Sequence, residues 1–218
     1  MKKLSMVLAG AMAVSVLGGC GNSFDAAEYL RAILDNSYKN DSSKFVSMKV
    51  GTEEEAKDLY EQGLKGEVDA LVTLSGTTAT DAQYEELKST FVGIYEATKY
   101  TVDGAEKQDD GSYAVTITYE QINVLGPAME AYAEEVDNMI ADWDSTGEYP
   151  DTDEMAEQFM DVYIDCFADA LANVTYDEAA TATIKVELVD QVWTPNTTDV
   201  NNFQTSLFDI EALQAALQ

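Results

Sequence analysis

The feature that most constrains this chain is its N-terminal stretch, MKKLSMVLAGAMAVSVLGGCG. Lys2 and Lys3 precede an apolar run, Leu4 to Leu17, that only small residues interrupt. A positive start, an apolar run of about 7–15 residues and small residues at its end are typical of a secretory signal. The run is too short to span ~30 Å of hydrocarbon as a permanent helix. We therefore expect residues 1–19 to be a signal peptide and the later residues to fold.

The end of this stretch, Leu17-Gly18-Gly19-Cys20, resembles the lipobox of bacterial lipoproteins, in which the cysteine is lipidated and becomes the mature N-terminus. The resemblance implies a lipid on Cys20, a short tether over residues 20–24 and one extracytoplasmic domain over residues 25–218. The protein would be exported and held at the bacterial cell surface by its lipid. The alternative is an ordinary secretory signal with a chance cysteine at the cleavage point.

The charge of the chain is strongly one-sided. It has 41 acidic and 12 basic residues, a net charge of −29, while 46% hydrophobic residues are enough to build a core. Nucleic-acid binding is excluded, because its affinity comes largely from Lys and Arg on phosphates. Anionic lipid would also repel the chain, so the acyl chain and not electrostatics would provide the anchor. A cationic partner is permitted, although acidic surfaces often serve solubility alone.

Hydrophobic periodicity predicts an α+β fold with helices packed on one face of a small antiparallel sheet. The two strands at 98–106 and 112–123 flank a Gly-containing turn and should form a hairpin, and a third strand is expected at 181–193. Helices are expected at 25–39, 52–74, 80–95 and 153–172, with one more after Phe203. A further helix should open with Pro127 at its first position and be interrupted over 142–153.

The order of these elements behind the lipobox resembles the small surface lipoproteins of clostridial-type bacteria. The matching segments are Phe24 to Lys39, Tyr100 to Ile122 and Thr181 to Trp193, the last ending in Val192-Trp193. Some of these lipoproteins have NTF2-like or cystatin-like folds, in which a curved antiparallel sheet wraps on helices and encloses a pocket. Most have no assigned function, so the resemblance implies an architecture and no catalytic residues.

The sequence offers no catalytic constellation. It has no His, which removes the commonest general base and metal ligand, and it contains no nucleophile elbow, phosphate loop or dinucleotide fingerprint. A carboxylate pair for hydrolysis could be drawn from the 41 acids, but no spacing selects one. We therefore expect a protein that is not an enzyme, with a carboxylate-based hydrolase as the third hypothesis.

Residues 142–153 resemble an EF-hand calcium loop, with acids at positions 1, 3 and 12 and Gly147 at position 6. The predicted ligands are Asp142, Asp144, Thr146, Glu148 and Asp153. A weakly held Ca²⁺ is the only cofactor that the sequence suggests. The alternative is an acidic helix–helix connection in which Asp153 caps the second helix.

Two aromatic residues are candidates for a ligand pocket. Trp193 ends the last expected strand, and Tyr119 lies on the apolar face of the strand at 112–123. Cys166 lies on an apolar helix stripe and is expected to be a small buried side chain. The leading hypothesis is a non-catalytic surface module that binds a small ligand, peptide or protein. The runner-up is a calcium-stabilised adhesion or scaffold module that uses residues 142–153.

Overall fold

The computed structural model describes residues 24–217, so the expected signal peptide 1–19 and Cys20 lie outside the described residues. The helices are α1 (Ala26–Lys39), α2 (Ser43–Ser47), α3 (Glu53–Ser75), α4 (Asp81–Ala97), α5 (Leu125–Thr146), α6 (Thr152–Ala172), α7 (Thr197–Leu207) and α8 (Ile210–Ala216). The strands are β1 (Lys99–Lys107), β2 (Tyr113–Glu120), β3 (Ile122–Asn123), β4 (Thr175–Tyr176), β5 (Ala180–Val189) and β6 (Val192–Pro195).

The main sheet is antiparallel and has the order β1-β2-β5-β6, and β3 pairs with β4 beside it. In β2, Val115 and Ile117 are fully buried, while Thr116 and Thr118 on the opposite face are partly exposed. Burial on one face follows from the alternation of side chains along a strand. The expected hairpin and its half-buried sheet are therefore confirmed.

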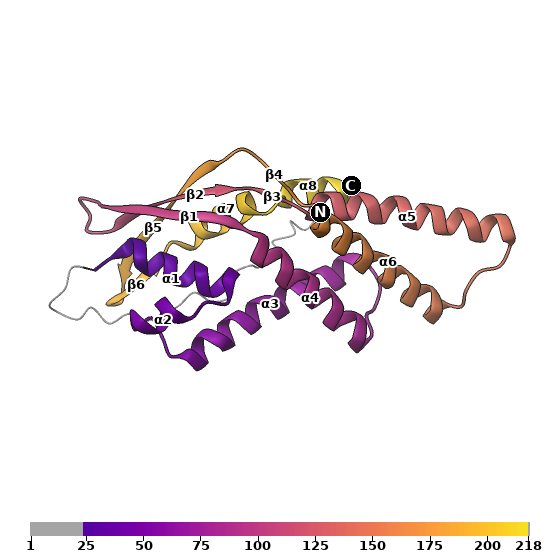
Figure 1. Cartoon of the computed structure of the whole chain (residues 1–218), viewed down its shortest axis with the longest axis horizontal. Helices are drawn as coiled ribbons and strands as arrows, with labels where there is room; N and C mark the ends of the chain where they lie inside the picture. Colours follow the sequence, from indigo (N-terminus) through magenta and orange to yellow (C-terminus); the bar gives the residue numbers. More distant parts are fainter. Residues whose placement is uncertain (1–23, 218) are drawn as a thin grey trace.

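Helices cover the buried face of this sheet and leave its other face open. Helix α1 packs against β1 and β2, and α7 packs against β5. Tyr119 of β2 meets Phe203 of α7 edge-on, which places α7 on the face that carries the buried β2 residues. Helices α3, α4 and α6 form a further layer, and Figure 1 shows α5 and α6 running away from the sheet along the long axis of the molecule. The predicted α+β class is confirmed.

The N-terminal ends of α3 and α4 form as their sequences predict. The Thr52 hydroxyl accepts from the Glu55 N–H, and the Glu55 carboxylate accepts from the Thr52 N–H in return. Thr80 and Gln83 make the same reciprocal pair at α4. Each box satisfies two backbone N–H groups that a helix start otherwise leaves unpaired.

The last expected strand, 181–193, is a hairpin of two strands instead of one. Asp190 and Gln191 both have positive φ angles, 50° and 68°, and turn the chain between β5 and β6. Two consecutive left-handed residues are the mark of a type I′ turn, which joins antiparallel strands with the correct twist. The prediction missed it because Asp-Gln is not among the usual Asn-Gly or Asp-Gly pairs for this turn.

Three helical predictions also need correction. Helix α5 begins at Leu125, two residues before Pro127, and continues to Thr146. The C-terminal region forms two helices, because Asn196 caps α7 from Thr197 and the chain then turns at Phe208 before α8. The short helix α2 has no counterpart among the expected helices.

The core is continuous across these elements, and Cys166 of α6 is buried as expected, with burial raising the pKa of its thiol. Its low exposure and high pKa suit a packing role better than a reactive thiol. Within residues 24–217, no helix is both long enough and apolar enough to cross a bilayer.

Candidate functional site

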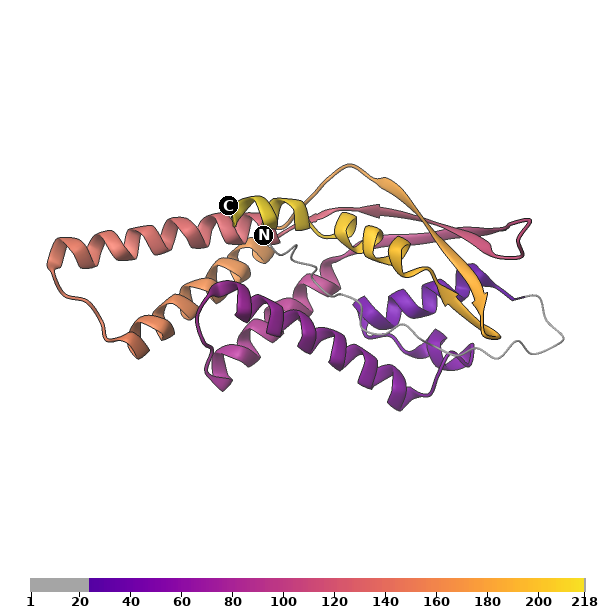
Figure 2. The ribbon, with the colours of Figure 1, turned by 180° about the vertical axis from the view of Figure 1, so that it is seen from behind.

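The α5–α6 hairpin is the part of the described chain with the least core. In α5 the buried residues end at Met129, and in α6 they begin only at Met160. Between these points the two helices contact each other, and α5 projects beyond the other layers, as Figure 2 shows from the opposite side. Helix α6 stays beside the α3–α4 turn, where the Thr77 hydroxyl donates to the Ala156 carbonyl at 3.2 Å and the Gln83 amide donates to the Glu157 carbonyl at 3.1 Å. We call residues 130–159 of this hairpin the acidic arm.

The acidic arm carries negative charge only. Its sequence contains no Lys, Arg or His and eleven acids, Glu130, Glu134, Glu135, Asp137, Asp142, Asp144, Glu148, Asp151, Asp153, Glu154 and Glu157. The wider stretch between Lys107 and Lys185 is also free of basic residues. Because no cation of its own lies among these carboxylates, the arm presents a field of one sign to a partner.

Apolar side chains line the seam between the two helices of the arm. Trp143 of α5 lies 5.6 Å from Phe159 of α6 and 6.2 Å from Tyr149 in the loop, measured between ring centroids. Ile140 and Tyr149 stay 40% and 55% exposed. Helix α4 packs on α6, where the Gln83 amide donates to the Glu157 carbonyl, but these two exposed side chains stay open to solvent.

Local chemistry defines the tip of the arm, where α5 ends and α6 begins. Gly147 closes α5 with φ 71°, and its N–H donates to the Trp143 carbonyl at 2.8 Å. Asp151 then caps α6 by accepting from the N–H groups of Asp153 and Glu154, both at 3.0 Å. A left-handed Gly and an Asp cap are the preferred residues at these two positions.

The structure does not bring the five predicted calcium ligands together. Asp142, Asp144 and Thr146 lie in the last turns of α5, Glu148 follows in the loop, and Asp153 lies in the first turn of α6. Since successive helical residues point about 100° apart, the first two carboxylates diverge by about 200°. The expected loop over 142–153 is corrected to 147–151. Nowhere in residues 24–217 do three or more acidic or Cys side chains gather as a metal site would require.

The two candidate pocket residues lie far apart. Tyr113, near Trp193, and Tyr119, near Phe203, are six positions apart along β2, a separation of about 20 Å at 3.4 Å per residue. Trp193 is instead part of an aromatic group at one end of the sheet. Open hollows occur elsewhere, including one of about 800 Å³ between α2 and the start of α3, which includes Phe45, Lys49 and Glu55 in its lining.

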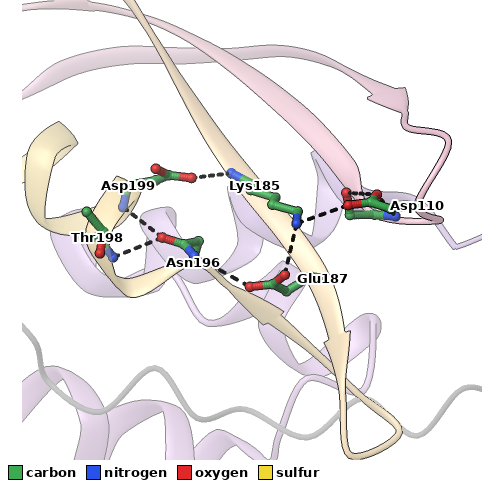
Figure 3. Close-up of polar contacts among 7 residues, drawn as sticks. Asp110, Lys185, Glu187, Asn196, Thr198 and Asp199 are labelled. Atoms are coloured by element: carbon green, nitrogen blue, oxygen red, sulfur yellow. Dashed lines mark hydrogen bonds and ion pairs between the residues drawn. The ribbon is translucent and has the colours of Figure 1, made fainter.

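A network of charged groups fastens the β1–β2 turn to β5 (Figure 3). The Lys185 ammonium lies 3.1 Å from both Asp110 and Glu187. Hydrogen bonds from Ser112, followed by the Lys185 charge, lower the pKa of Asp110 to about 2, and those two carboxylates raise the pKa of Lys185. Each charge therefore has a partner within the network, which suits a structural role.

The backbone of β5 continues this network into α7. The Lys185 N–H donates to the Asp199 carboxylate at 2.9 Å, and the Lys185 carbonyl accepts from the Asn196 N–H at 2.7 Å. The Asn196 side chain caps α7 through the N–H groups of Thr198 and Asp199 (Figure 3). These hydrogen bonds thus attach the end of the β5–β6 hairpin, and the start of α7 that follows it, to strand β5.

One buried ionisable group escaped the sequence prediction. Glu67 of α3 is 1% exposed, and neither of its carboxylate oxygens has a hydrogen-bond partner. Burial raises its pKa to about 8. A signal was present, since Glu67 falls on the stripe of Tyr60, Leu64 and Leu71 at spacings of three and four residues.

No protein-family model and no curated protein matches the chain. A crystal structure of a "putative lipoprotein (ycdA)" from Bacillus subtilis is similar, with a TM-score of 0.53 and 15% sequence identity. The match covers 84% of this chain and 56% of the Bacillus chain, so this protein spans little more than half the length of that neighbour. At this identity the similarity shows the fold alone: the α+β architecture of this chain is one that a bacterial protein with that name also has.

Proposed function

We propose that this protein is a lipid-anchored, extracytoplasmic binding module without catalytic activity, whose acidic arm binds a basic amphipathic segment of a protein partner. The observation that carries the proposal is the arm itself. Eleven acids and no basic residue surround a seam whose Ile140 and Tyr149 are exposed. The resemblance to NTF2-like or cystatin-like folds and to clostridial-type surface lipoproteins remains a prediction.

The chemistry of the arm selects the kind of partner. One-sign charge speeds the encounter with a cation and rejects acidic partners, while apolar contacts slow the dissociation. A helix with Lys or Arg on one side and apolar residues on the other would satisfy both features, as in other helix-in-groove complexes. The exposed apolar side chains distinguish this proposal from acidity that serves solubility alone.

The position of the arm supports the proposed anchorage. The described chain starts at Phe24, four residues after Cys20, and Figure 1 shows this start and the α5–α6 loop at opposite ends of the long axis. A lipid on Cys20 would hold one end of the molecule at the membrane and leave the arm available to partners away from it.

The test is a titration with a synthetic amphipathic helix of Leu and Lys, using the mature chain with Cys20→Ser. A scrambled peptide of the same composition is the peptide control, because it keeps the charge but has no apolar face. We expect tight binding of the amphipathic peptide only, and weakening at high salt.

Matched variants then locate the binding. In the arm, Glu134→Gln, Asp137→Asn and Glu154→Gln remove three exposed charges; on the body, Glu54→Gln, Asp58→Asn and Glu86→Gln remove the same number. Glu54 and Glu154 both lie in the first turns of their helices. We expect the arm variant to weaken binding about fivefold more than the body variant. Equal losses would show unspecific attraction to an acidic protein and would refute the proposal.

A further inference from the structure

The β5–β6 hairpin exposes adjacent apolar residues at the end of the molecule opposite the arm. Leu188 is 54% exposed and Val189 is 47% exposed, directly before the turn at Asp190. Leu188 shares the face of β5 that carries the buried Ile184 and Val186, since their positions differ by two residues each. The apolar face of the sheet thus continues past its covering helices and ends uncovered.

Aromatic rings join this hairpin to the start of the described chain. The Trp193 indole stacks on the Phe24 ring at 4.3 Å between centroids and 3° between planes. Tyr113 meets both rings edge-on, and the Tyr29 hydroxyl donates to the Trp193 carbonyl at 2.6 Å. Leu188 pairs with Trp193 across the strands. We call Phe24, Tyr113, Leu188, Val189 and Trp193 the hairpin end.

The covalent chain keeps the hairpin end close to Cys20. Four residues span at most about 14 Å even when fully extended, so Phe24 cannot lie farther than this from an acylated Cys20. Figures 1 and 2 agree that the beginning of the coloured chain and the β5–β6 hairpin lie side by side. A bilayer that holds the lipid therefore lies within reach of the exposed side chains.

We propose that the hairpin end rests in the interface of the bilayer to which Cys20 is attached, with Leu188 and Val189 against the acyl boundary and the Phe24–Trp193 stack at headgroup depth. This inference rests on the proposed lipid anchorage. Trp is enriched at this depth because its ring is apolar and its N–H is polar. Two apolar residues are too few to hold a protein on a membrane alone, so the acyl chains provide the attachment and the hairpin sets the orientation.

Charge around the hairpin end specifies the lipid. Lys185, the cation nearest to the hairpin in the network described above, is already paired with Asp110 and Glu187, and Asp190 adds a further negative charge at the turn. Lys107, opposite Tyr113 in the β1–β2 pair, adds one positive charge, while Glu106 and Asp109 of the same segment add two negative charges. The surface that docks is therefore one for zwitterionic headgroups, since anionic headgroups would be repelled.

The two Trp residues of the chain provide the test, because Trp193 belongs to the hairpin end and Trp143 to the arm. The full lipidated chain is reconstituted in phosphatidylcholine vesicles whose acyl chains carry bromine, which quenches nearby indoles. Trp143→Phe leaves Trp193 as the only indole, and Trp193→Phe leaves Trp143. We expect quenching of Trp193 at least threefold stronger than that of Trp143, and weaker Trp193 quenching when the vesicles contain anionic lipid.

Two further variants separate docking from attachment. Leu188→Ser with Val189→Ser should reduce the quenching of Trp193 by about half without changing flotation with the vesicles, while Ile140→Ser, at an exposed apolar residue of the arm, should change neither. A chain that floats while Trp193 and Trp143 are quenched equally refutes the docking and leaves the anchorage intact. A chain that does not float refutes the anchorage, and the docking with it.

Discussion

The Gly126 backbone N–H donates to the Asp209 carboxylate at 2.7 Å, across 83 residues of sequence. The Leu125 N–H donates to the second oxygen of the same carboxylate at 2.9 Å. Asp209, at the start of α8, thus supplies the cap that α5 lacks from its own N-cap residue, Val124. The base of the acidic arm is held by the C-terminal helix, so the position of the arm depends on α8.

Substituting glycines at two helical sites should have opposite effects. A Cβ on Gly126 would lie 2.6 Å from the Ala212 Cβ and 3.1 Å from Asp209, so Gly126→Ala should force α8 away and lower the free energy of unfolding by about 2 kcal/mol. A Cβ on Gly66, in α3, meets nothing within 4 Å, so Gly66→Ala should raise it by about 0.5–1 kcal/mol. Urea unfolding of both variants tests this pair, and destabilisation by Gly66→Ala would contradict it.

Removing the Asp209 carboxylate should destabilise the chain more than removing an exposed cap. Asp209→Ala leaves two buried N–H groups unpaired, which we expect to cost about 2–3 kcal/mol. Asp25 caps α1 at the surface through the Glu28 N–H, so Asp25→Ala should cost about 1 kcal/mol. Denaturant melts measure both costs, and hydrogen exchange should show the larger loss of protection in the first turn of α5. Equal costs would mean that water replaces the Asp209 carboxylate as the hydrogen-bond partner of the two buried N–H groups.

Local sequence signals predicted most of the elements and few of the contacts between them. The capping boxes at Thr52 and Thr80 and the alternation in β2 act within a few residues, so they could be read directly. The start of α5 could not be predicted in this way, because it depends on Asp209, which only the tertiary fold brings near. Pro127 tolerates the third helical position as well as the first, since neither needs its missing N–H.

The same division between local signals and tertiary contacts applies to the candidate site. The absence of basic residues between Lys107 and Lys185 is visible in the sequence. The sequence does not show that the acids of α5 lie on a helix that projects beyond the other layers (Figure 2). Gly147 fits the sixth position of a calcium loop and equally the left-handed end of a helix, and the structure uses it as the latter. Residue spacing alone could not separate these two roles.

The β5–β6 turn predicts a simple stabilising substitution. Gln191 has a φ of 68°, which a residue with a Cβ adopts at a cost and Gly adopts freely. Gln191→Gly should therefore raise the free energy of unfolding by about 0.5–1 kcal/mol. Gln108→Gly, in the β1–β2 turn at a position without positive φ, is the control and should lower it through the added freedom of the unfolded chain. If both substitutions change the free energy of unfolding in the same direction, the positive φ of Gln191 is not the cause. Thermal melts are sufficient for this comparison.

Glu67 predicts how stability depends on pH. Burial raises the pKa of Tyr95 and of Tyr38, and the nearby Glu67 raises both further. Since a tyrosine is neutral or negative, neither ring provides Glu67 with a positive charge. The Glu67 carboxyl has a pKa of about 8 in the fold against 4.5 in the absence of burial. The unfolded chain therefore loses this proton first as the pH rises, and folding must keep the group protonated or bury a charge.

The sign of the effect follows from these two values. Below pH 4.5 both states are protonated and the group costs nothing extra; between pH 4.5 and 8 each unit of pH lowers the free energy of unfolding by up to about 1.4 kcal/mol. Glu67→Gln has nearly the same shape and no proton to lose. It should match the native chain near pH 4.5 and exceed its free energy of unfolding by an amount on the order of 3 kcal/mol near pH 7.

Comparison of variants at each pH is essential, because a chain with a net charge of −29 becomes less self-repulsive on acidification whatever Glu67 does. Glu54→Gln, at an exposed residue of the same helix, changes the net charge by the same amount and serves as the control. Its difference from the native chain should stay within a few tenths of a kcal/mol from pH 4.5 to 8. If the Glu67→Gln difference is equally flat, then Glu67 is ionised inside the fold and has a cation or water beside it. If the difference grows with pH, α3 carries a protonated carboxyl at neutral pH.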